Sequence, residues 1–135
     1  MNTAGDVASF GGLSSDSAYR IAILDPFSPR NLACVVELVG SIATSGTYER
    51  GEHLIDPHSG RPAAHVASAS LCGPVFGLAD ALATAIAVPG EPGLAIVESI
   101  EDYEALVISF DETWRWTEHF SFPFGNSCSR ERSDC

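Results

Sequence analysis

Two oxygen-bearing side chains on a predicted helix are the clearest candidates for chemistry. Asp80 and Thr84 lie four residues apart, and on a helix that spacing places both on one face, one turn apart. A carboxylate and a hydroxyl arranged in this way suit a hard cation such as Mg²⁺, which takes oxygen ligands and usually keeps water or substrate phosphate. Two structural explanations stay open. An Asp in the first helical turn complements the helix macrodipole, and a Thr hydroxyl can bond a backbone carbonyl one turn earlier.

A second group of candidates lies in the stretch 43–64, which is rich in Gly, Pro and polar side chains. His53 and Asp56 are three residues apart, and a His near a carboxylate can act as a general base near neutral pH. Asp56 precedes a proline and is equally suited to forming a turn. His58 and His65 lie nearby, but their spacing matches no standard metal site. The stretch reads either as a loop posed for binding or as a long surface loop.

A hydroxyl-rich turn, Ser45-Gly46-Thr47, offers backbone N–H groups and side-chain oxygens to a phosphate. It is not a P-loop, because no Gly-Lys-Ser/Thr follows it, and no G-x-S-x-G nucleophile elbow is present. Arg50 and Arg61 are the cations of the same region. Each suits either an anion clamp or a surface salt bridge, and the salt bridge is the commoner role.

Composition indicates one globular domain and an acidic surface. The chain has 135 residues, 45% hydrophobic and 19% charged, with seven Lys and Arg against eighteen Asp and Glu and a formal net charge of -11. Such a surface repels nucleic-acid backbones and anionic lipid, so partners of those classes are not expected. An anionic nucleotide would need a metal ion or helix N-termini as positive partners.

The cysteines signal neither a zinc site nor a disulfide framework. Cys34, Cys72, Cys128 and Cys135 form no C-x-x-C pair, and the first two fall in apolar runs that favour small core residues. No apolar stretch reaches about eighteen residues, and no signal-peptide pattern opens the chain. We therefore expect a soluble chain without an export signal as written.

Hydrophobic periodicity predicts strands interleaved with few helices. The predicted strands are 19–23, a β-like run from 32 to 42 that ends at 44–46, then 66–71, 105–110 and 114–116, the last pairing with its predecessor. The main helix is expected over 77–88, where apolar residues recur at helical spacing at Leu78, Leu82, Ala85 and Ile86. A short second helix is expected over 93–99. This order predicts an α+β fold with a largely antiparallel sheet and one main helix.

Taken together, these motifs resemble the C-terminal half of the ApbE family, the FAD:protein FMN transferases. The matching pieces follow the family's order and spacing over roughly residues 2–111. They are Asn2 with Gly5-Asp6, then Asp25-Pro26, then segments 43–50, 53–62 and 79–85. The resemblance implies that residues 1–126 are the C-terminal portion of a T-fold-like ApbE domain. Residues 127–135 are expected to be a frayed polar tail.

The resemblance also implies an activity and a site. Family members take FAD and Mg²⁺, attach FMN to a Thr hydroxyl of an acceptor flavoprotein, and release AMP. By this resemblance Asp80 and Thr84 match the side-chain Mg²⁺ ligands, and His53 matches a His near the reacting phosphate. Leu54 matches a position whose backbone contacts the flavin nucleotide. Ser45, Gly46, Asp56, Gly5 and Asp6 lie in the matching motifs and are expected to bind the cofactor.

Departures from the family keep other hypotheses open. Family enzymes are longer, and their N-terminal half supplies flavin-stacking residues and a further Mg²⁺ ligand, so we expect an incomplete site here. The family's double Gly before Asp6 is Ala4-Gly5, and its usual Thr in Asp-Pro-x-Thr-Gly is Ser59. The alternatives are a non-catalytic remnant or interaction module, and an FAD pyrophosphatase. Unpaired strand edges would favour self-association of the isolated chain. Family members are bacterial, either exported and membrane-anchored or cytoplasmic.

Overall fold

The computed structural model describes residues 2–3, 6–8, 19–38, 40–46, 54–63 and 65–120. Its six-stranded sheet has the order β1-β2-β5-β6-β7-β8, with neighbouring strands antiparallel. The strands are β1 (Asn2–Thr3), β2 (Asp6–Ala8), β5 (Ser41–Gly46), β6 (Val66–Gly73), β7 (Glu104–Ser109) and β8 (Trp114–Trp116). A separate hairpin consists of β3 (Tyr19–Asp25) and β4 (Ser28–Leu38), and two helices follow β6, α2 (Phe76–Ala87) and α3 (Glu91–Glu98). The predicted α+β fold with antiparallel sheets is confirmed.

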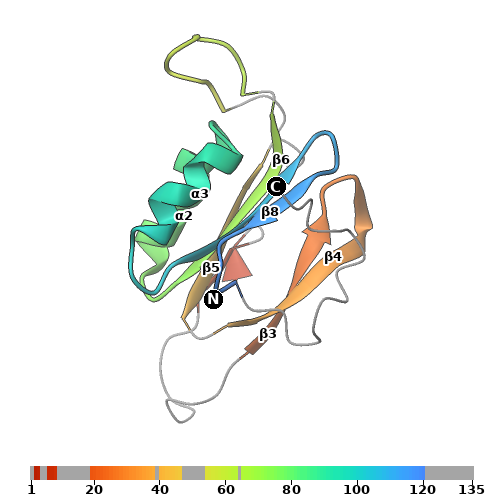
Figure 1. The fold of residues 1–135 in the computed structure, drawn as a ribbon. Coiled ribbons are helices and arrows are strands. Elements are labelled where there is room, and N and C mark those ends of the chain that lie inside the picture. The colour runs from red at the N-terminus through yellow and green to blue at the C-terminus, as the bar shows by residue number, and fades with distance from the viewer. Residues whose placement is uncertain are drawn as a thin grey trace.

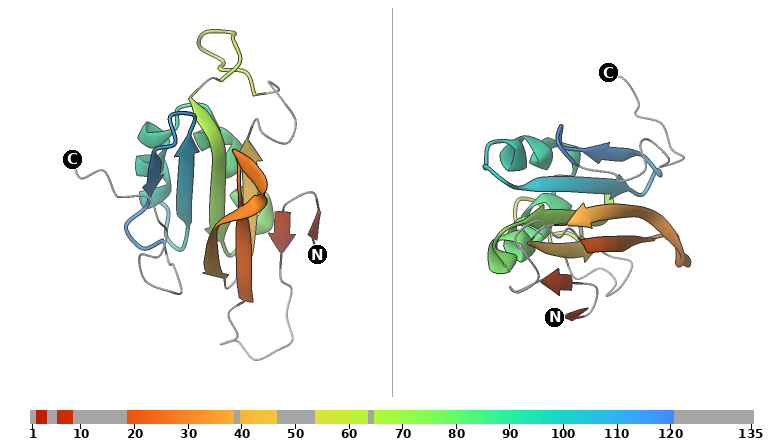
Figure 2. Two further views of the ribbon diagram at one scale, coloured as in Figure 1. Left: turned by 90° about the vertical axis from the view of Figure 1, so that its right-hand side faces the viewer. Right: turned by 90° about the horizontal axis from the view of Figure 1, so that it is seen from below.

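The main sheet is covered on both faces. The two helices lie on one face and the β3–β4 hairpin lies on the other (Figure 1), an arrangement also visible from the two further directions in Figure 2. Residues of β7 alternate between the layers. Ala105 and Val107 join a cluster with the helices, and Leu106 and Ile108 join one with the hairpin. Burial on both faces explains why β7 reads as a continuous apolar run.

The two hydrophobic clusters lie on opposite faces of the main sheet, and we name each by the helices or the hairpin that cover it. The helix-side cluster consists of Ala43, Leu54, Ala63, Val66, Ala69, Leu71, Ala79, Ala83, Ile86, Ala87, Leu94, Val97, Tyr103, Ala105 and Val107. The hairpin-side cluster consists of Ile23, Val36, Ile42, Leu106, Ile108, Trp114 and Phe120. At its tip the hairpin also reaches the end of β7, where the rings of Phe27 and Phe110 meet edge to face with centroids 6.5 Å apart.

The prediction of one β-like run over 32–46 was wrong, because Gly40 divides it. Gly40 has φ +109 and a side chain there would place its Cβ 2.7 Å from the carbonyl oxygen of Gly73. Only glycine combines that backbone conformation with so close an approach. The chain consequently leaves the hairpin after β4 and enters the main sheet as β5.

Helix α2 is confirmed, and its buried face matches the predicted one only in part, at Ile86 and partly at Leu82. Its buried residues are Ala79, Ala83, Ile86 and Ala87, whereas Leu78 and Ala85 are exposed and Leu82 is half-buried. The sheet surface beneath α2 is built from small residues such as Ala43 and Ala69, so the alanine stripe of the helix packs there. The helix begins at Phe76 and has no acidic residue in its first turn. Asp80 lies beyond that turn, and its macrodipole explanation is therefore wrong.

The other elements agree with the predictions, with shifted ends. Strand β6 is buried at nearly every position instead of alternating, because the layers cover both of its faces. Helix α3 begins at Glu91, two residues earlier than predicted, with Pro92 in its first turn, where a missing N–H is tolerated. Strand β8 pairs with β7 as expected.

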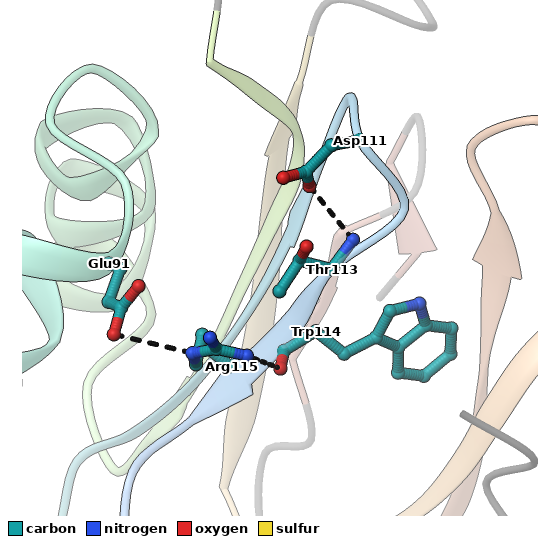
Figure 3. A network of polar contacts seen from close by, with 5 residues as sticks. All are labelled: Glu91, Asp111, Thr113, Trp114 and Arg115. Atoms are coloured by element: carbon teal, nitrogen blue, oxygen red, sulfur yellow. Dashed lines mark hydrogen bonds and ion pairs between the residues drawn. The ribbon is translucent and has the colours of Figure 1, made fainter. Parts of the chain in front are cut away.

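Polar contacts tie the short strand β8 to its surroundings (Figure 3). The carboxylate of Asp111 accepts a hydrogen bond from the backbone N–H of Thr113 at 3.0 Å and shapes the turn before β8. The Arg115 guanidinium donates to the carbonyl oxygen of Trp114 at 3.1 Å and lies 3.3 Å from the carboxylate of Glu91. Strand β8 is thereby linked to the start of α3.

The two cysteines within the described part of the chain are partly buried against the hairpin-side cluster, as predicted. Burial raises the pKa of the Cys72 thiol to about 12, and the negative charge of Glu104 adds to the shift, so this thiol stays protonated at neutral pH. Cys128, Cys135 and the predicted tail 127–135 lie outside the described residues. Within the described residues, no helix has the length and apolar character needed to cross a membrane.

Candidate functional site

The end of β5 meets the exposed flank of α2. Ser45 Oγ lies 3.0 Å from Thr84 Oγ1, although the two residues are 39 positions apart in the sequence. Side chains along β5 alternate between the layers, so Ser45 is on the same face as Ala43, which belongs to the helix-side cluster. Helix α2 packs across β5 and β6 on that face. The structure therefore brings together two of the residues that the sequence singled out.

The Thr84 hydroxyl makes a second contact within the helix. It donates to the carbonyl oxygen of Asp80 at 3.2 Å, as the structural explanation for this Thr predicted. A hydroxyl has one proton and two lone pairs. If Thr84 donates to Asp80 and accepts from Ser45, one lone pair of its oxygen is left for a further ligand. The backbone contact and a metal contact are therefore compatible.

Asp80 supplies a free negative charge beside this pair. Its four-residue spacing from Thr84 within α2 places both side chains on one helical face. Asp80 is exposed, and no other residue in the described part of the chain forms a hydrogen bond or ion pair with its carboxylate. A carboxylate and two hydroxyls form an all-oxygen set of donors. That chemistry fits Mg²⁺ better than it fits a thiophilic or imidazole-seeking metal.

The protein side of this site is sparse. Within the described residues, no group of three or more His, Cys, Asp or Glu side chains could hold a metal ion, and His53 lies outside those residues. Mg²⁺ typically binds through one or two carboxylates and completes its shell with water and substrate phosphates. Asp80 and Thr84, with Ser45 beside them, fit that type of site.

The segment 54–63 forms a tight, anchored turn. Leu54 and Ala63 are buried in the helix-side cluster, and the Ala63 N–H donates to the Leu54 carbonyl at 2.8 Å. Between them, Ile55 and Pro62 form an antiparallel bridge. The turn stands at the end of the sheet where β5 ends and β6 begins (Figure 1). It is thus held at the same end of the sheet as Ser45.

Asp56 organises the tip of this turn. Its carboxylate accepts a hydrogen bond from the His58 N–H at 2.9 Å, and its carbonyl accepts one from the N–H of Gly60 at 2.8 Å, where φ is +67. The His58 N–H, and next the hydroxyl of Ser59, hold the pKa of Asp56 below its ordinary value, so the carboxylate is ionised at neutral pH. The turn-forming reading of Asp56 is confirmed, and its cofactor contact stays a prediction.

The remaining candidates are placed only in part. Arg61 is exposed and forms no ion pair with any residue of the described ranges, so the salt-bridge reading finds no support there. Asp6 lies in β2, where its backbone pairs with Thr3. The calls on His53 and Gly5 lie outside the described residues, as do those on residues 47 and 50.

Sequence reasoning missed the link between Ser45 and Thr84. It assigned Ser45 to a phosphate contact and Thr84 to a metal, without joining them. The period of two along β5 carried the available signal, since Ser45 follows Ala43 by two residues and must share its face. The sequence pattern did not indicate that α2 covers that face of β5.

Comparisons with known proteins show which family the chain belongs to. The model of the ApbE family matches residues 1–107. A curated FAD:protein FMN transferase from Rhodobacter capsulatus is 37% identical over 100 residues, which is 67% of this chain and 19% of that protein. The chain therefore spans about a fifth of the length of this curated relative.

Solved structures resemble the chain over most of its length. The ApbE protein from Thermotoga maritima superimposes with a TM-score of 0.73 at 26% identity, covering 85% of this chain and 41% of that one. The flavin transferase ApbE from Vibrio cholerae gives a TM-score of 0.65 at 30% identity, covering 85% and 40%. The fold and these similarities thus define a domain of the ApbE flavin transferase type. The chain belongs to the ApbE family.

Proposed function

We propose that this chain carries the metal-binding portion of a Mg²⁺-dependent FAD:protein FMN transferase. Such an enzyme moves FMN from FAD to a Thr hydroxyl of an acceptor flavoprotein and releases AMP. The observation that carries the proposal is the contact between Ser45 and Thr84 beside the free carboxylate of Asp80, in a chain of the ApbE family. Residues 1–126 would form this portion of the domain.

The charge distribution supports a metal-dependent reaction. The chain has no Lys or Arg between Arg61 and Arg115, a span that includes β6, both helices and β7. The pyrophosphate of FAD is anionic, and α2 presents a carboxylate to it. A divalent cation held by Asp80 and Thr84 would neutralise that charge and stabilise the charge that develops during phosphoryl transfer.

The proposed transfer is a nucleophilic substitution at phosphorus. The hydroxyl oxygen of the acceptor Thr attacks the phosphorus on the FMN side of the pyrophosphate and forms a new P–O bond. The P–O bond to the AMP portion breaks, and AMP leaves with the electron pair. The hydroxyl proton passes to a base, for which His53 is the candidate. Ser45 would orient the Thr84 oxygen, and the anchored turn 54–63 would hold the nucleotide side of the site.

The test is the mass of an acceptor flavoprotein co-expressed with the full-length gene. We expect wild type to add one FMN, and Asp80→Ala to reduce the yield about 100-fold or more, because a metal contributes several kcal/mol to such a transition state. Glu98→Ala, which removes an exposed acid of α3, is the matched control and should transfer normally. An unmodified acceptor with wild type, or an unchanged yield with Asp80→Ala, would contradict the proposal.

The same preparation separates the alternative functions. Release of AMP from FAD without any acceptor would indicate an FAD pyrophosphatase. Failure to bind FAD in the presence of Mg²⁺ would indicate a non-catalytic interaction module. The partners that follow from the proposal are FAD and an acceptor flavoprotein with a target Thr. A second copy of the chain, contacting through exposed sheet edges, is a further proposed partner.

A further inference from the structure

Helix α2 begins without a cap from its own sequence. The N-cap residue is Val75, and no side chain of the segment caps the helix, although the first N–H groups of a helix need partners. Tyr103, which directly precedes β7, supplies a hydrogen-bond partner at the start of α2 instead. Its hydroxyl accepts a hydrogen bond from the Val75 N–H at 3.2 Å and lies 3.5 Å from the Val75 carbonyl oxygen. A residue 28 positions away therefore holds the start of the helix.

The ring of Tyr103 fits only because residue 73 is glycine. Tyr103 is 5% exposed, and a Cβ on Gly73 would lie 2.2 Å from the ring atoms Cδ1 and Cε1. Real Cβ atoms do not approach other atoms so closely. Gly73 is not among the residues of positive φ, so the requirement at this position is space and not backbone conformation. Gly73 and Tyr103 thus form one structural unit.

This unit is also fastened to β5. The Ser41 hydroxyl, which is buried, donates to the carbonyl oxygen of Gly73 at 2.7 Å, and the two residues are register partners. Ser41 therefore bonds the last residue of β6, and the Tyr103 ring lies close to the same residue. The first residue of β5, the last residue of β6 and the residue before α2 all meet at this junction.

From this junction two rigid elements run to the candidate site. Strand β5 carries Ser45 four residues after Ser41, and α2 carries Asp80 five residues after Val75. Ser45 and Thr84 come within 3.0 Å of each other further along these two elements. Resting on the proposed function, we propose that Tyr103 is a positioning residue that sets Asp80 and Thr84 against Ser45 and thereby tunes metal affinity.

The test uses the full-length protein and Mn²⁺, which accepts the same oxygen ligands as Mg²⁺. Binding of Mn²⁺ is measured calorimetrically in the presence of FAD, and folding by thermal melting. Tyr103→Phe keeps the ring but loses the hydroxyl, and we expect about 10-fold weaker Mn²⁺ binding, the loss typical of groups that orient metal ligands. Tyr19→Phe, an exposed Tyr in β3, is the matched control and should bind as wild type.

A second variant tests the unit of Gly73 and Tyr103 by changing the glycine. Gly73→Ala should displace the ring and weaken Mn²⁺ binding as Tyr103→Phe does. In a Tyr103→Ala background the same change should add little, since the ring is already gone and neighbouring sites are not additive. Full additivity of Gly73→Ala and Tyr103→Ala would overturn the proposed unit. If Tyr103→Phe does not fold, Ser41→Ala loosens the same junction from β5 and is expected to weaken Mn²⁺ binding.

The outcomes separate this inference from the proposed function. A wild type that binds Mn²⁺ and FAD but transfers no FMN overturns the proposed function, while the affinities still decide the role of Tyr103. A wild type that transfers FMN, with a Tyr103→Phe variant of unchanged Mn²⁺ affinity, overturns this inference alone. A lower melting temperature with unchanged affinity also overturns it, because Tyr103 would then be merely structural.

Discussion

The two faces of the main sheet are packed in different ways. On the helix side, alanine is frequent where α2 meets β5 and β6, namely at Ala43, Ala69, Ala79, Ala83 and Ala87. The hairpin-side cluster contains no alanine among its fully buried members, which are large aliphatic and aromatic residues. Small side chains let a helix approach the sheet closely, whereas large ones hold two layers apart.

This difference decides where short hydroxyls can meet. On the helix side, Ser45 reaches Thr84 across the two layers at 3.0 Å. On the other face of β5, Thr44 bonds Ser70 at 2.9 Å, but these two residues are partners in adjacent strands of one sheet. A site formed between layers therefore depends on the close approach that the alanines allow.

The largest effect on stability is expected from the hairpin side. Ile108→Ala removes a fully buried side chain, and the cavity should lower the free energy of unfolding by about 2–5 kcal/mol. Urea unfolding of the chain measures this. Binding of Mn²⁺ with FAD by the folded full-length protein should stay at the wild-type level, because Ile108 faces away from α2. Loss of metal affinity in this variant would contradict the view that only the packing on the helix side assembles the site.

A smaller cost in stability, with a larger consequence for the site, is expected on the helix side. Ala83→Leu forces extra volume between α2 and the sheet and should cost about 1–3 kcal/mol. Lifting the helix would also separate Ser45 from Thr84 and weaken Mn²⁺ binding.

Ala81→Leu, at an exposed position of the same helix, controls for the change in side chain and should stay within about 0.5 kcal/mol of wild type. Unchanged metal affinity in Ala83→Leu would show that close packing is not what assembles the site.

The smallest effect on the free energy of unfolding is expected from changes at the exposed edge of the β3–β4 hairpin. Within the described ranges, β3 and β4 pair only with each other, and the hairpin exposes Leu24 and Leu32. We expect the isolated chain to sediment as a dimer or larger species, since unpaired edges and apolar side chains invite association. Leu32→Glu should shift it toward monomer with about 0.5 kcal/mol or less change in stability. A wild-type monomer at all concentrations would contradict the prediction.

Much of the fold was predictable because it depends on neighbours in the sequence. An apolar run indicated β7, alternation with small polar residues indicated most of β6, and helical spacing indicated α2, since each of these patterns is complete within a few residues. The division at Gly40 was not predictable. Nothing in the local apolar pattern distinguishes a glycine inside a strand from one that must approach Gly73. The prediction of the buried face of α2 was right at Ile86 but missed Ala79, Ala83 and Ala87, because the surface that these alanines contact comes from distant strands.

In the candidate site, too, local spacing predicted some features and tertiary packing created others. The spacing of Asp80 and Thr84 was enough to predict that they share a helical face, since four residues of helix fix that geometry without any partner. The sequence also determined the order of motifs that marks the ApbE family. Tertiary packing brings the Ser45 hydroxyl of β5 to Thr84 of α2, and the Tyr103 hydroxyl to the start of α2. Those contacts join residues 39 and 28 positions apart, and they exist only once close packing has brought the layers together.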